Sequence, residues 1–360
     1  MSEVYILCAQ HLVSTSYSLF HTLLQLGLQP SNLSAIGKCY STNPEAVAEM
    51  QKLGIDICES SLSFNSHTSF DQQYKQNIKK FIRSRILTLK NSRFKKIVVL
   101  DDGGELLLEA NTTLGDDPRL IGIEQTSSGH RKIKQQKLNF PVINVARSPA
   151  KLNHESPIIA KLVLKSLIVS LTSLDLKPEK ALVIGNGPIG AHISRVLEPT
   201  HETLVFDKAP SKSYIKPENL QNALETSDLI IGCTGTTVLD SKEFDRLKKN
   251  AILVSASSSD REFKAQSLRK RIPLVSDCHQ HLLIEDKWLI NCGFPINFSS
   301  NFREVDSDEL QLTRSLLLSA ILQATNELGI TANKRLVSLD PENQRDILLK
   351  YYSLFQKEDT

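Results

Sequence analysis

The sequence predicts an α/β protein built from two doubly wound lobes. Short apolar segments alternate with amphipathic ones from residue 3 to about 145, which is the pattern of a parallel sheet covered by helices. A second series of this kind starts near residue 181, with an apolar strand that runs into a glycine-rich turn. At 360 residues the chain exceeds the length at which one hydrophobic core usually stops growing. We therefore expect two domains.

The first lobe shows strands and helices in strict alternation. Its expected strands cover residues 4–8, 33–36, 55–58, 96–100 and 120–123, and its expected helices cover residues 14–26, 44–53 and 70–89. Gly27 and Gly54 follow the first two helices, where a glycine commonly ends a helix. Polar loops follow the strands that end at Leu100 and Ile123. Because ligands bind at the carboxyl ends of parallel strands, we expect these loops to form a site.

The second lobe follows a long apolar helix at residues 157–176. The expected strands cover residues 181–184, 204–207, 228–232, 251–255 and 274–276, and a hairpin of residues 282–284 and 288–291 closes the series. A capping box at residues 306–309 starts another apolar helix, and residues 340–360 form an amphipathic one. The expected domains are residues 1–157, residues 158–297, and residues 298–360 returning to the first domain.

Composition points to small-molecule chemistry. Hydrophobic residues make up 40% of the chain, charged residues 23%, and the net charge is only +3. This small basic excess gives no reason to expect nucleic acid as a partner. The six cysteines have no framework spacing, which predicts reduced thiols in a cytoplasmic protein. Lys161 and Lys165 interrupt the longest apolar segment, so we expect no membrane span.

The glycine-rich turn is the strongest local motif. Gly185, Gly187 and Gly190 form G-x-G-x-x-G between a strand and a helix that begins at Pro188-Ile189, the arrangement that binds a pyrophosphate on backbone N–H groups. Asp207 ends the next strand about 22 residues after Gly185, where a carboxylate binds the ribose of NAD. The motif therefore predicts NAD rather than NADP. A glycine turn that only lets a helix pack on a strand is the alternative.

A second motif, Leu100-Asp-Asp-Gly-Gly104, lies at the end of a strand in the first lobe. Two adjacent carboxylates followed by two glycines are unusual at such a place, and Asp102 is the candidate base. The alternative is a capped turn before the helix that begins near Glu105.

At these residues the chain resembles the S-adenosylhomocysteine hydrolase (adenosylhomocysteinase) family. Asp101-Asp-Gly-Gly-Glu105 resembles its Asp-Asp-Gly-Gly-Asp loop, and the segment from Gly122 to Gly129 resembles its Glu-Glu-Thr-Thr-Thr-Gly segment. The segment from Val142 to Lys151 is similar to its Ala-Ile-Asn-Val and active-site lysine, and Tyr40-Ser-Thr42 to its Phe-Ser-Thr. The resemblance runs in order from residue 3 to about 325. It identifies the chain as a divergent member.

The resemblance implies a chemistry and roles for particular residues. In the family, bound NAD oxidises the ribose 3′-carbon, the 4′ proton is removed, the 5′-thiol is eliminated, water adds and the hydride returns. By position, Lys151 would accept the 3′-hydroxyl proton, Asp102 the 4′ proton, and His11 would serve the 5′ group. Glu155 stands for the family's aspartate at the sugar hydroxyls, and Gln125 and Ser156 stand for further substrate-binding residues.

The resemblance also implies cofactor contacts from both lobes. Besides the glycine turn, the cofactor-binding residues would be Thr126, Ser127, Ser128, Thr234, Gly235 and Asn291. Gln125 replaces a glutamate, two family histidines are replaced within residues 255–258 and 296–299, and the family's C-terminal motif is missing. These departures leave the substrate open within nucleoside-type molecules. They also favour a homo-oligomer that is a dimer rather than a tetramer.

Several alternatives remain open. The protein could be a non-catalytic NAD-binding homologue with a regulatory or sensing role, or an ordinary dehydrogenase that exchanges free NAD(H). Cys278-His-Gln-His281 has the wrong spacing for a metal site, so we expect no metal. The basic run at residues 75–96 is typical of a solvated helix face, with an anionic partner as the alternative.

Overall fold

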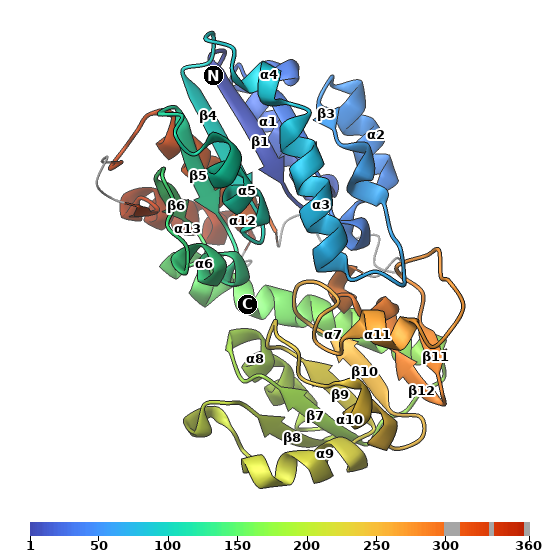
Figure 1. The fold of residues 1–360 in the computed structure, drawn as a ribbon. Helices are drawn as coiled ribbons and strands as arrows, with labels where there is room; N and C mark the ends of the chain where they lie inside the picture. The colour runs from blue at the N-terminus through green and yellow to red at the C-terminus, as the bar shows by residue number, and fades with distance from the viewer. Residues whose placement is uncertain (299–309, 331–334, 356–360) are drawn as a thin grey trace. The chain divides into compact units, whose positions relative to one another are not determined.

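The structure, a computed structural model, describes residues 1–298, 310–330 and 335–355 (Figure 1). The chain forms two compact units. Unit 1 comprises Met1–Ser63, Tyr74–Glu155 and Asp306–Thr360, and unit 2 comprises Phe64–Gln73 and Ser156–Val305. Both units are α/β, with parallel strands and covering helices, so the fold class predicted from the sequence is confirmed.

Unit 1 contains a seven-stranded parallel sheet with the order β13-β6-β5-β4-β1-β2-β3. Its strands are β1 (Val4–Ala9), β2 (Leu33–Ile36), β3 (Asp56–Ile57), β4 (Lys96–Asp101), β5 (Leu120–Glu124), β6 (Val142–Asn144) and β13 (Leu336–Ser338). From β1 the chain builds the sheet in one direction through β2 and β3, and then returns to the other side of β1 with β4. The topological switch point therefore lies between β1 and β4, where such sheets bind ligands.

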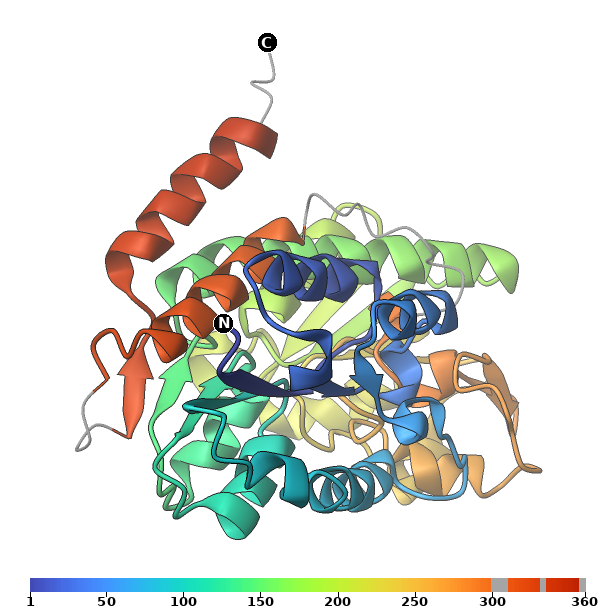
Figure 2. The same ribbon diagram turned by 90° about the horizontal axis from the view of Figure 1, so that it is seen from above.

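Helices cover both faces of this sheet (Figure 2). The helices of unit 1 are α1 (Ser14–Gln25), α2 (Pro44–Lys52), α3 (Phe70–Arg83, which starts in unit 2), α4 (Ile86–Leu89), α5 (Glu105–Leu114), α6 (Ser127–Lys134), α12 (Gln311–Thr325) and α13 (Pro341–Phe355). Buried residues of α1, α2 and α12 pack on alternate side chains of β1 and β4, such as Ile6 and Val98. The opposite face carries α3, α4 and α5.

Unit 2 contains a six-stranded sheet with the order β11-β12-β10-β9-β7-β8. Its strands are β7 (Lys180–Ile184), β8 (Glu202–Phe206), β9 (Leu229–Gly232), β10 (Ile252–Ser255), β11 (Leu282–Ile284) and β12 (Lys287–Leu289), and only the β11–β12 pair is antiparallel. Its helices are α7 (Ser156–Ser173), α8 (Pro188–Leu197), α9 (Leu220–Thr226), α10 (Ser241–Arg246) and α11 (Ala265–Arg269). The switch point lies between β7 and β9, and the glycine turn that follows β7 lies at this point.

Several expected elements differ from the structure. Residues 274–276 form no strand: Leu274 is 71% exposed, and the Val275 N–H donates to the hydroxyl of Ser66 at 3.1 Å. The hairpin β11–β12 pairs with β10 in their place. Strand β13 was not expected, and it extends the sheet through β6. The capping box expected at residues 306–309 lies outside the described residues.

The helix Lys151–Ser173 is long and apolar enough to cross a membrane, with a mean hydropathy of 1.4. The expectation that Lys161 and Lys165 make this stretch too polar is therefore wrong by that criterion, because two lysines do not outweigh the Leu, Ile and Val around them. One-third of the most apolar window, 33%, is buried within the protein. Core helices of globular proteins share these properties, so the helix by itself does not establish a span.

Candidate functional site

The switch point of unit 1 brings His11, Asp102 and Gln125, which the sequence predicted separately, together with polar residues that it did not predict. Gln10 and His11 follow β1, and Asp101 and Asp102 end β4 beside them, with Ala9 paired to Asp101 in the sheet register. Asp101 is in turn paired with Glu124 at the end of β5, which places Gln125 next in line. The parallel sheet therefore brings strand ends that are far apart in sequence to one edge.

Asp102 is the centre of this cluster. Its side chain is only 5% exposed, and it forms an ion pair with Lys38 through one oxygen while accepting a hydrogen bond from the Gln125 amide through the other. The His11 Nε2 atom lies 3.4 Å from the same carboxylate. Burial alone would raise the pKa of Asp102, but the charge of Lys38 and the neighbouring His11 hold it well below its usual value. Asp102 is therefore a firmly ionised carboxylate and a weak base.

Lys38 is the partner that sequence reasoning missed. It lies two residues beyond β2, just before the single turn Cys39–Ser41, and its side chain is 4% exposed. Burial would lower the pKa of its ammonium group, but Asp102 raises it above the usual range. Its place after a strand at the carboxyl edge was the one signal available from the sequence.

His11 is held between two groups. Its Nδ1 atom lies 2.5 Å from the Ser41 hydroxyl, and its Nε2 atom faces Asp102. Burial lowers the pKa of His11 against the opposing effect of Asp102. The imidazole is therefore neutral near pH 7, and it can accept a proton.

Asp101 and Glu124 form a second pair of acids beneath Asp102. Both are fully buried, and each has one carboxylate oxygen without a hydrogen-bond partner. The other Glu124 oxygen accepts from the backbone N–H and the hydroxyl of Thr126, each at 2.7 Å. Burial raises the pKa of Asp101 to about 7 and that of Glu124 well above its usual value. One or both of these acids are therefore protonated at neutral pH.

Lys151 and Glu155 form a neighbouring ion pair on the single π-helical turn Lys151–Glu155. The Lys151 Nζ atom lies 2.5 Å from Glu155 Oε2 and 2.8 Å from Oε1. The hydroxyl of Thr313, on α12, donates to Glu155 Oε1 at 2.7 Å. Ser156 is the first residue of α7 and of this segment of unit 2, whereas Lys151 and Glu155 belong to unit 1.

Arg314, on α12, is bound to the polar cluster at the switch point of unit 1. Its guanidinium donates to the Thr15 hydroxyl from Nε and Nη2, at 3.2 and 3.1 Å, and to Gln10 Oε1 from Nη1 at 3.3 Å. Gln10 donates in turn to Gln125 Oε1 at 3.0 Å. Because Thr313 precedes Arg314, α12 touches both ends of the cluster. Arg314 gave no signal in the sequence, since its partners lie about 300 residues earlier.

The three hydroxyl residues after Gln125 differ in their surroundings. Thr126 caps α6, because its hydroxyl accepts from the Gly129 N–H at 2.9 Å and donates to Glu124. Ser127 is exposed and Ser128 is half-buried. The Thr126 hydroxyl is therefore engaged in folding the turn, which leaves the two serines as the accessible hydroxyls.

The glycine turn of unit 2 has the geometry of a pyrophosphate cradle. Gly185 has φ +103°, a conformation that favours glycine. A Cβ on Gly190 would lie 1.9 Å from the Gly185 carbonyl oxygen, so α8 approaches β7 too closely for any other residue, whereas a Cβ on Gly187 would meet nothing within 4 Å. The first turn of α8, at Pro188 and Ile189, has no side-chain cap. Pro188 has no N–H, so the backbone N–H groups that follow it, from Ile189 onward, are the ones available to an anion.

Asp207, just after β8, faces this turn. Its Oδ2 atom accepts from the backbone N–H of Asn186 at 2.7 Å, and its Oδ1 atom accepts from Ala209 N–H at 2.8 Å. The buried Oδ1 atom of Asn186 has no partner. Asp207 keeps further acceptor capacity for ribose hydroxyls and also fixes the turn. These features fit a dinucleotide such as NAD.

The other expected contacts of unit 2 lie in the loop after β9 and in the turn after β12. Thr234 and Gly235 donate from their backbone N–H groups to Glu262 Oε1 at 2.6 and 3.0 Å. Glu262 is fully buried, which raises its pKa, and it was not predicted. Asn291 is also fully buried: its amide donates to the Pro295 carbonyl at 3.0 Å, and its oxygen lies 3.2 Å from His279 Nδ1. The buried Glu262 side chain therefore fixes the backbone of Thr234 and Gly235, and the buried Asn291 side chain fixes the turn after β12.

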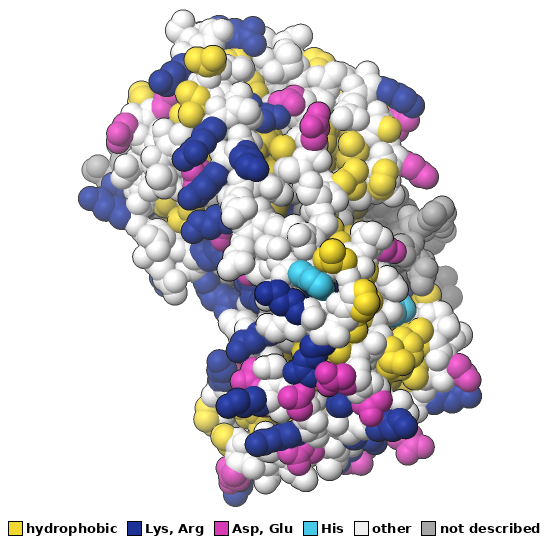
Figure 3. Space-filling model, turned by 45° about the vertical axis from the view of Figure 1, so that its right-hand side comes forward, with side chains coloured by type: hydrophobic (Ala, Val, Ile, Leu, Met, Phe, Trp, Pro, Cys, Tyr) yellow, Lys and Arg dark blue, Asp and Glu magenta, His cyan; other side chains and the backbone are white. Residues whose placement is uncertain are grey.

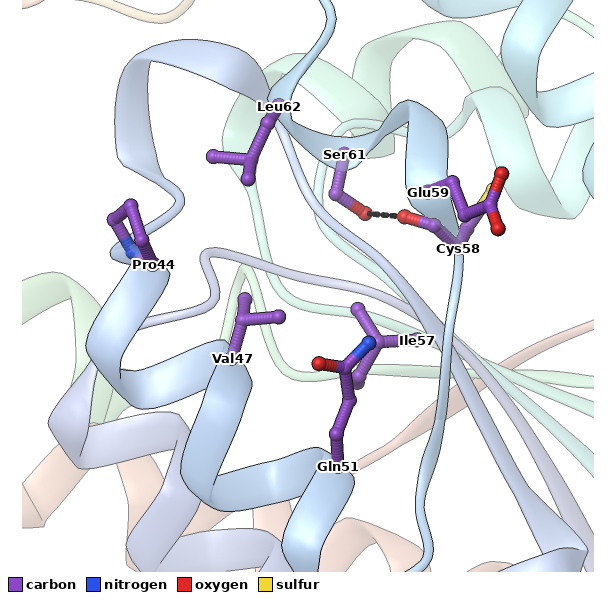
Figure 4. Close-up of a pocket in the computed structure, with 8 residues that line it drawn as sticks. All are labelled: Pro44, Val47, Gln51, Ile57, Cys58, Glu59, Ser61 and Leu62. Carbon is purple, nitrogen blue, oxygen red and sulfur yellow. Dashed lines mark hydrogen bonds between the residues drawn. The ribbon is translucent and has the colours of Figure 1, made fainter.

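Other candidate features lie outside these clusters. A pocket of about 240 Å³ is lined by Pro44, Val47, Gln51, Ile57, Cys58, Glu59, Ser61 and Leu62 (Figure 4). None of these residues belongs to the polar cluster. Among the described residues no group of His, Cys, Asp and Glu has the arrangement of a metal site, and all six cysteines are free. On the face drawn in Figure 3, Lys and Arg side chains are interspersed with Asp and Glu.

Two α/β units, one with a dinucleotide-type glycine turn at its switch point, place the protein in the class of two-domain Rossmann proteins. No family model matches the chain. Over 359 residues the chain is 38% identical to the Mycobacterium tuberculosis proteins "Uncharacterized protein Rv0104" and "Uncharacterized protein MT0113", covering 98% of this chain and 70% of each relative. The chain belongs to the family of these proteins.

More distant similarities extend to enzymes. The chain is 25% identical over 302 residues to the adenosylhomocysteinase of Acinetobacter baylyi, which covers 75% of this chain and 62% of that enzyme. This match supports a loose relationship to the adenosylhomocysteinases. Among solved structures, the NAD-complexed D-isomer specific 2-hydroxyacid dehydrogenase from Lactobacillus delbrueckii ssp. bulgaricus is 10% identical, with a TM-score of 0.36 and coverage of 97% of both chains.

Proposed function

We propose that the protein is an adenosylhomocysteinase-like enzyme that uses bound NAD to oxidise the ribose 3′-carbon of a nucleoside-type substrate. The observation that carries the proposal is that two polar groups of unit 1 meet at Thr313 and Arg314, consecutive residues of α12. One group contains Lys151 and Glu155 and the other contains Asp102 and His11, the four residues assigned to proton transfer and sugar binding by the resemblance. A protein that had lost its chemistry would have no need to keep all four side chains in these two groups.

The residues of unit 2 provide the cofactor part of the proposal. The N–H groups after Gly187 would hold the pyrophosphate, and Asp207 would bind the adenosine ribose. When bound, NAD supplies a hydride acceptor that can return the hydride later in the cycle. A carboxylate at this position repels the 2′-phosphate of NADP, so we propose NAD as the cofactor.

Unit 1 would supply binding and proton transfer. Glu155 fixes Lys151, which can exchange a proton with the ribose 3′-oxygen once that oxygen displaces the carboxylate. His11 is neutral at pH 7 and can take up or release the proton of a 5′ group. The Ser127 and Ser128 hydroxyls are accessible as donors and acceptors. These roles fit reversible oxidation at the 3′-carbon.

Removal of the 4′ proton places a harder demand on Asp102. Lys38 and the Gln125 amide occupy both of its oxygens, so Asp102 has little basicity while these bonds last. We propose that oxidation is the primary reaction, and that cleavage of S-adenosylhomocysteine to adenosine and homocysteine follows only where the substrate separates Asp102 from Lys38. With other substrates the reaction would stop at oxidation or lead to epimerisation, and the products of both are to be tested.

The proposal is tested by incubating the purified protein and NAD with adenosine, S-adenosylhomocysteine and related nucleosides. NADH absorbance reports oxidation, and thiol release reports cleavage. We expect Lys151→Met to abolish NADH formation, because the group that exchanges the 3′ proton is lost, while Lys134→Met, at an exposed lysine of α6, leaves it unchanged. Absence of both signals with every nucleoside would refute the enzyme.

A non-catalytic NAD-binding homologue with a regulatory or sensing role is the second candidate. The Lys38–Asp102 ion pair favours it, because a locked carboxylate suits a site that binds without reacting. This candidate predicts NAD binding without turnover. It also predicts that Asp102→Asn changes the response to ligands no more than the control Asp116→Asn, at an exposed residue of unit 1. We further propose that the protein is cytoplasmic and that it forms a homodimer. Sedimentation of the native protein tests the homodimer.

A further inference from the structure

Arg314 is a buried cation without a buried anion. Its residue is 7% exposed, and among the described residues it makes no ion pair. The other three buried cations of the described residues differ in this respect: Lys38 is paired with Asp102, Arg269 with Asp260 at 2.6 Å, and Lys287 with Asp286 at 2.8 Å. Taking a charge out of water is costly unless another charge compensates it. Arg314 therefore lacks the partner that this fold provides for comparable groups.

The guanidinium is nevertheless held in a fixed orientation. The Thr15 hydroxyl accepts from two of its nitrogens and Gln10 Oε1 accepts from the third. Both acceptors are neutral and fully buried, and Gln10 is itself fixed by Gln125. A guanidinium has five N–H donors in a planar fork, so two remain beyond these three bonds. The arrangement orients the fork and leaves donors for a ligand.

The surrounding charges strengthen this interpretation. Asp102 forms its ion pair with Lys38, and Glu155 with Lys151, so these carboxylates attract Arg314 only from a distance and neither forms an ion pair with it. Arg314 keeps its charge at neutral pH, because an arginine does not lose its proton in proteins. His11 and Glu155, with side chains 16% and 15% exposed, mark where the cluster meets solvent. One positive charge is left over beside the candidate catalytic groups.

We propose that Arg314, positioned by Thr15 and Gln10, forms an anion subsite that binds a carboxylate or phosphate group of the substrate. This proposal rests on the function proposed above, and it narrows the substrate to a nucleoside with an anionic substituent. An oxyanion satisfies the two remaining N–H donors and supplies the missing charge. Arg314 lies two hydrogen bonds from Gln125 and three from Asp102, through Gln10, which places the anionic group within the same cluster.

The test compares nucleosides that have a carboxylate or phosphate group with nucleosides that have neither. Adenosine, 5′-methylthioadenosine, S-adenosylhomocysteine and adenosine 5′-monophosphate are titrated calorimetrically against the full-length protein with NAD. We expect the wild type to bind an anionic nucleoside at least about tenfold more tightly than adenosine, as a charge-assisted hydrogen bond allows. Preference for S-adenosylhomocysteine over 5′-methylthioadenosine identifies a carboxylate, and preference for the monophosphate identifies a phosphate.

Variants then assign the preference to Arg314. We expect Arg314→Gln to bring the anionic nucleosides to within about twofold of adenosine, and Arg314→Lys to retain part of the preference. NAD affinity and the melting temperature serve as controls for folding. The melting temperature of Arg314→Gln should be equal to or above that of the wild type, because an uncompensated buried charge is removed.

The outcomes separate this proposal from the proposed function. Equal binding of neutral and anionic nucleosides by the wild type would overturn the anion subsite, even if NADH is formed. A preference that survives in Arg314→Gln would overturn the assignment to this residue. A preference that is lost in Arg314→Gln, in a protein that oxidises no nucleoside, would support the subsite and refute the enzyme.

Discussion

Replacing Lys38 by methionine tests the central ion pair of unit 1. The substitution keeps most of the side-chain volume and leaves the Asp102 carboxylate buried, 5% exposed, without its main counter-charge. Removing one partner of a buried ion pair typically costs about 3–5 kcal/mol, because the remaining charge is uncompensated. Gln125 and His11 stay in place and reduce this cost. We therefore expect unit 1 to lose about 3 kcal/mol at pH 7, the lower end of that range.

The pH dependence gives this prediction a sign. In the wild type the folded-state pKa of Asp102 lies below its unfolded value, so the stability it contributes is present above about pH 4 and is lost as the pH falls through the folded pKa. In Lys38→Met burial dominates, and the folded pKa rises above the unfolded one. The variant should therefore regain stability as the pH falls from 7 towards about 4. Proton uptake by His11 beside Asp102 would act in the same direction.

Hydrogen exchange of β1 and β4 amides in increasing urea is the suitable assay. The single tryptophan, Trp288, lies in β12 of unit 2, so its fluorescence reports the other unit. Lys134→Met is the matched control on the surface of unit 1. Adding Asp102→Asn to Lys38→Met should restore most of the lost free energy. A loss below about 1 kcal/mol, typical of exposed pairs, or a double variant no more stable than the single one, would refute the reasoning.

Three further predictions use other parts of the molecule. Glu124→Gln should weaken the pH dependence of the stability of unit 1, because burial raises the folded pKa of Glu124, and raises that of the neighbouring Asp101 to about 7. Raised folded pKa values make the wild type lose stability as the pH rises from about 4 through 7. Unfolding of the wild type and the variant at pH 5 and pH 8 measures the difference. Gly187→Ala should lower NAD affinity at an unchanged melting temperature, whereas Gly190→Ala should lower both the affinity and the melting temperature. Only the Cβ added at Gly190 meets backbone, at 1.9 Å from the Gly185 carbonyl oxygen. Equal effects of the two substitutions on the calorimetric NAD affinity and on the melting temperature would contradict this prediction. Arg269→Met should destabilise unit 2 by about 3–5 kcal/mol, because it leaves Asp260 buried and unpaired, and Trp288 fluorescence during urea unfolding checks it.

Much of the framework was predictable from the sequence because it depends on local pattern. Apolar runs such as Lys96–Asp101 and Leu120–Glu124 became buried parallel strands, and their polar ends came together at one edge as parallel topology requires. The same rule failed at residues 274–276, where a short apolar run after Pro273 carries no ladder hydrogen bonds within the described sheet. Short segments such as Leu336–Ser338 carry too little pattern to be recognised alone.

The candidate site divides along the same line. The sequence by itself determined the glycine turn and the strand-end carboxylate Asp102, because each is a local motif with a fixed relation to a strand. The roles of the proton-transfer candidates came from the resemblance to the adenosylhomocysteinases and stay predictions. Only the tertiary structure decided that Lys38 locks Asp102 and that Arg314 lies buried beside Gln10, about 300 residues away. Charge balance inside a protein depends on which side chains meet in space, and no local pattern records that.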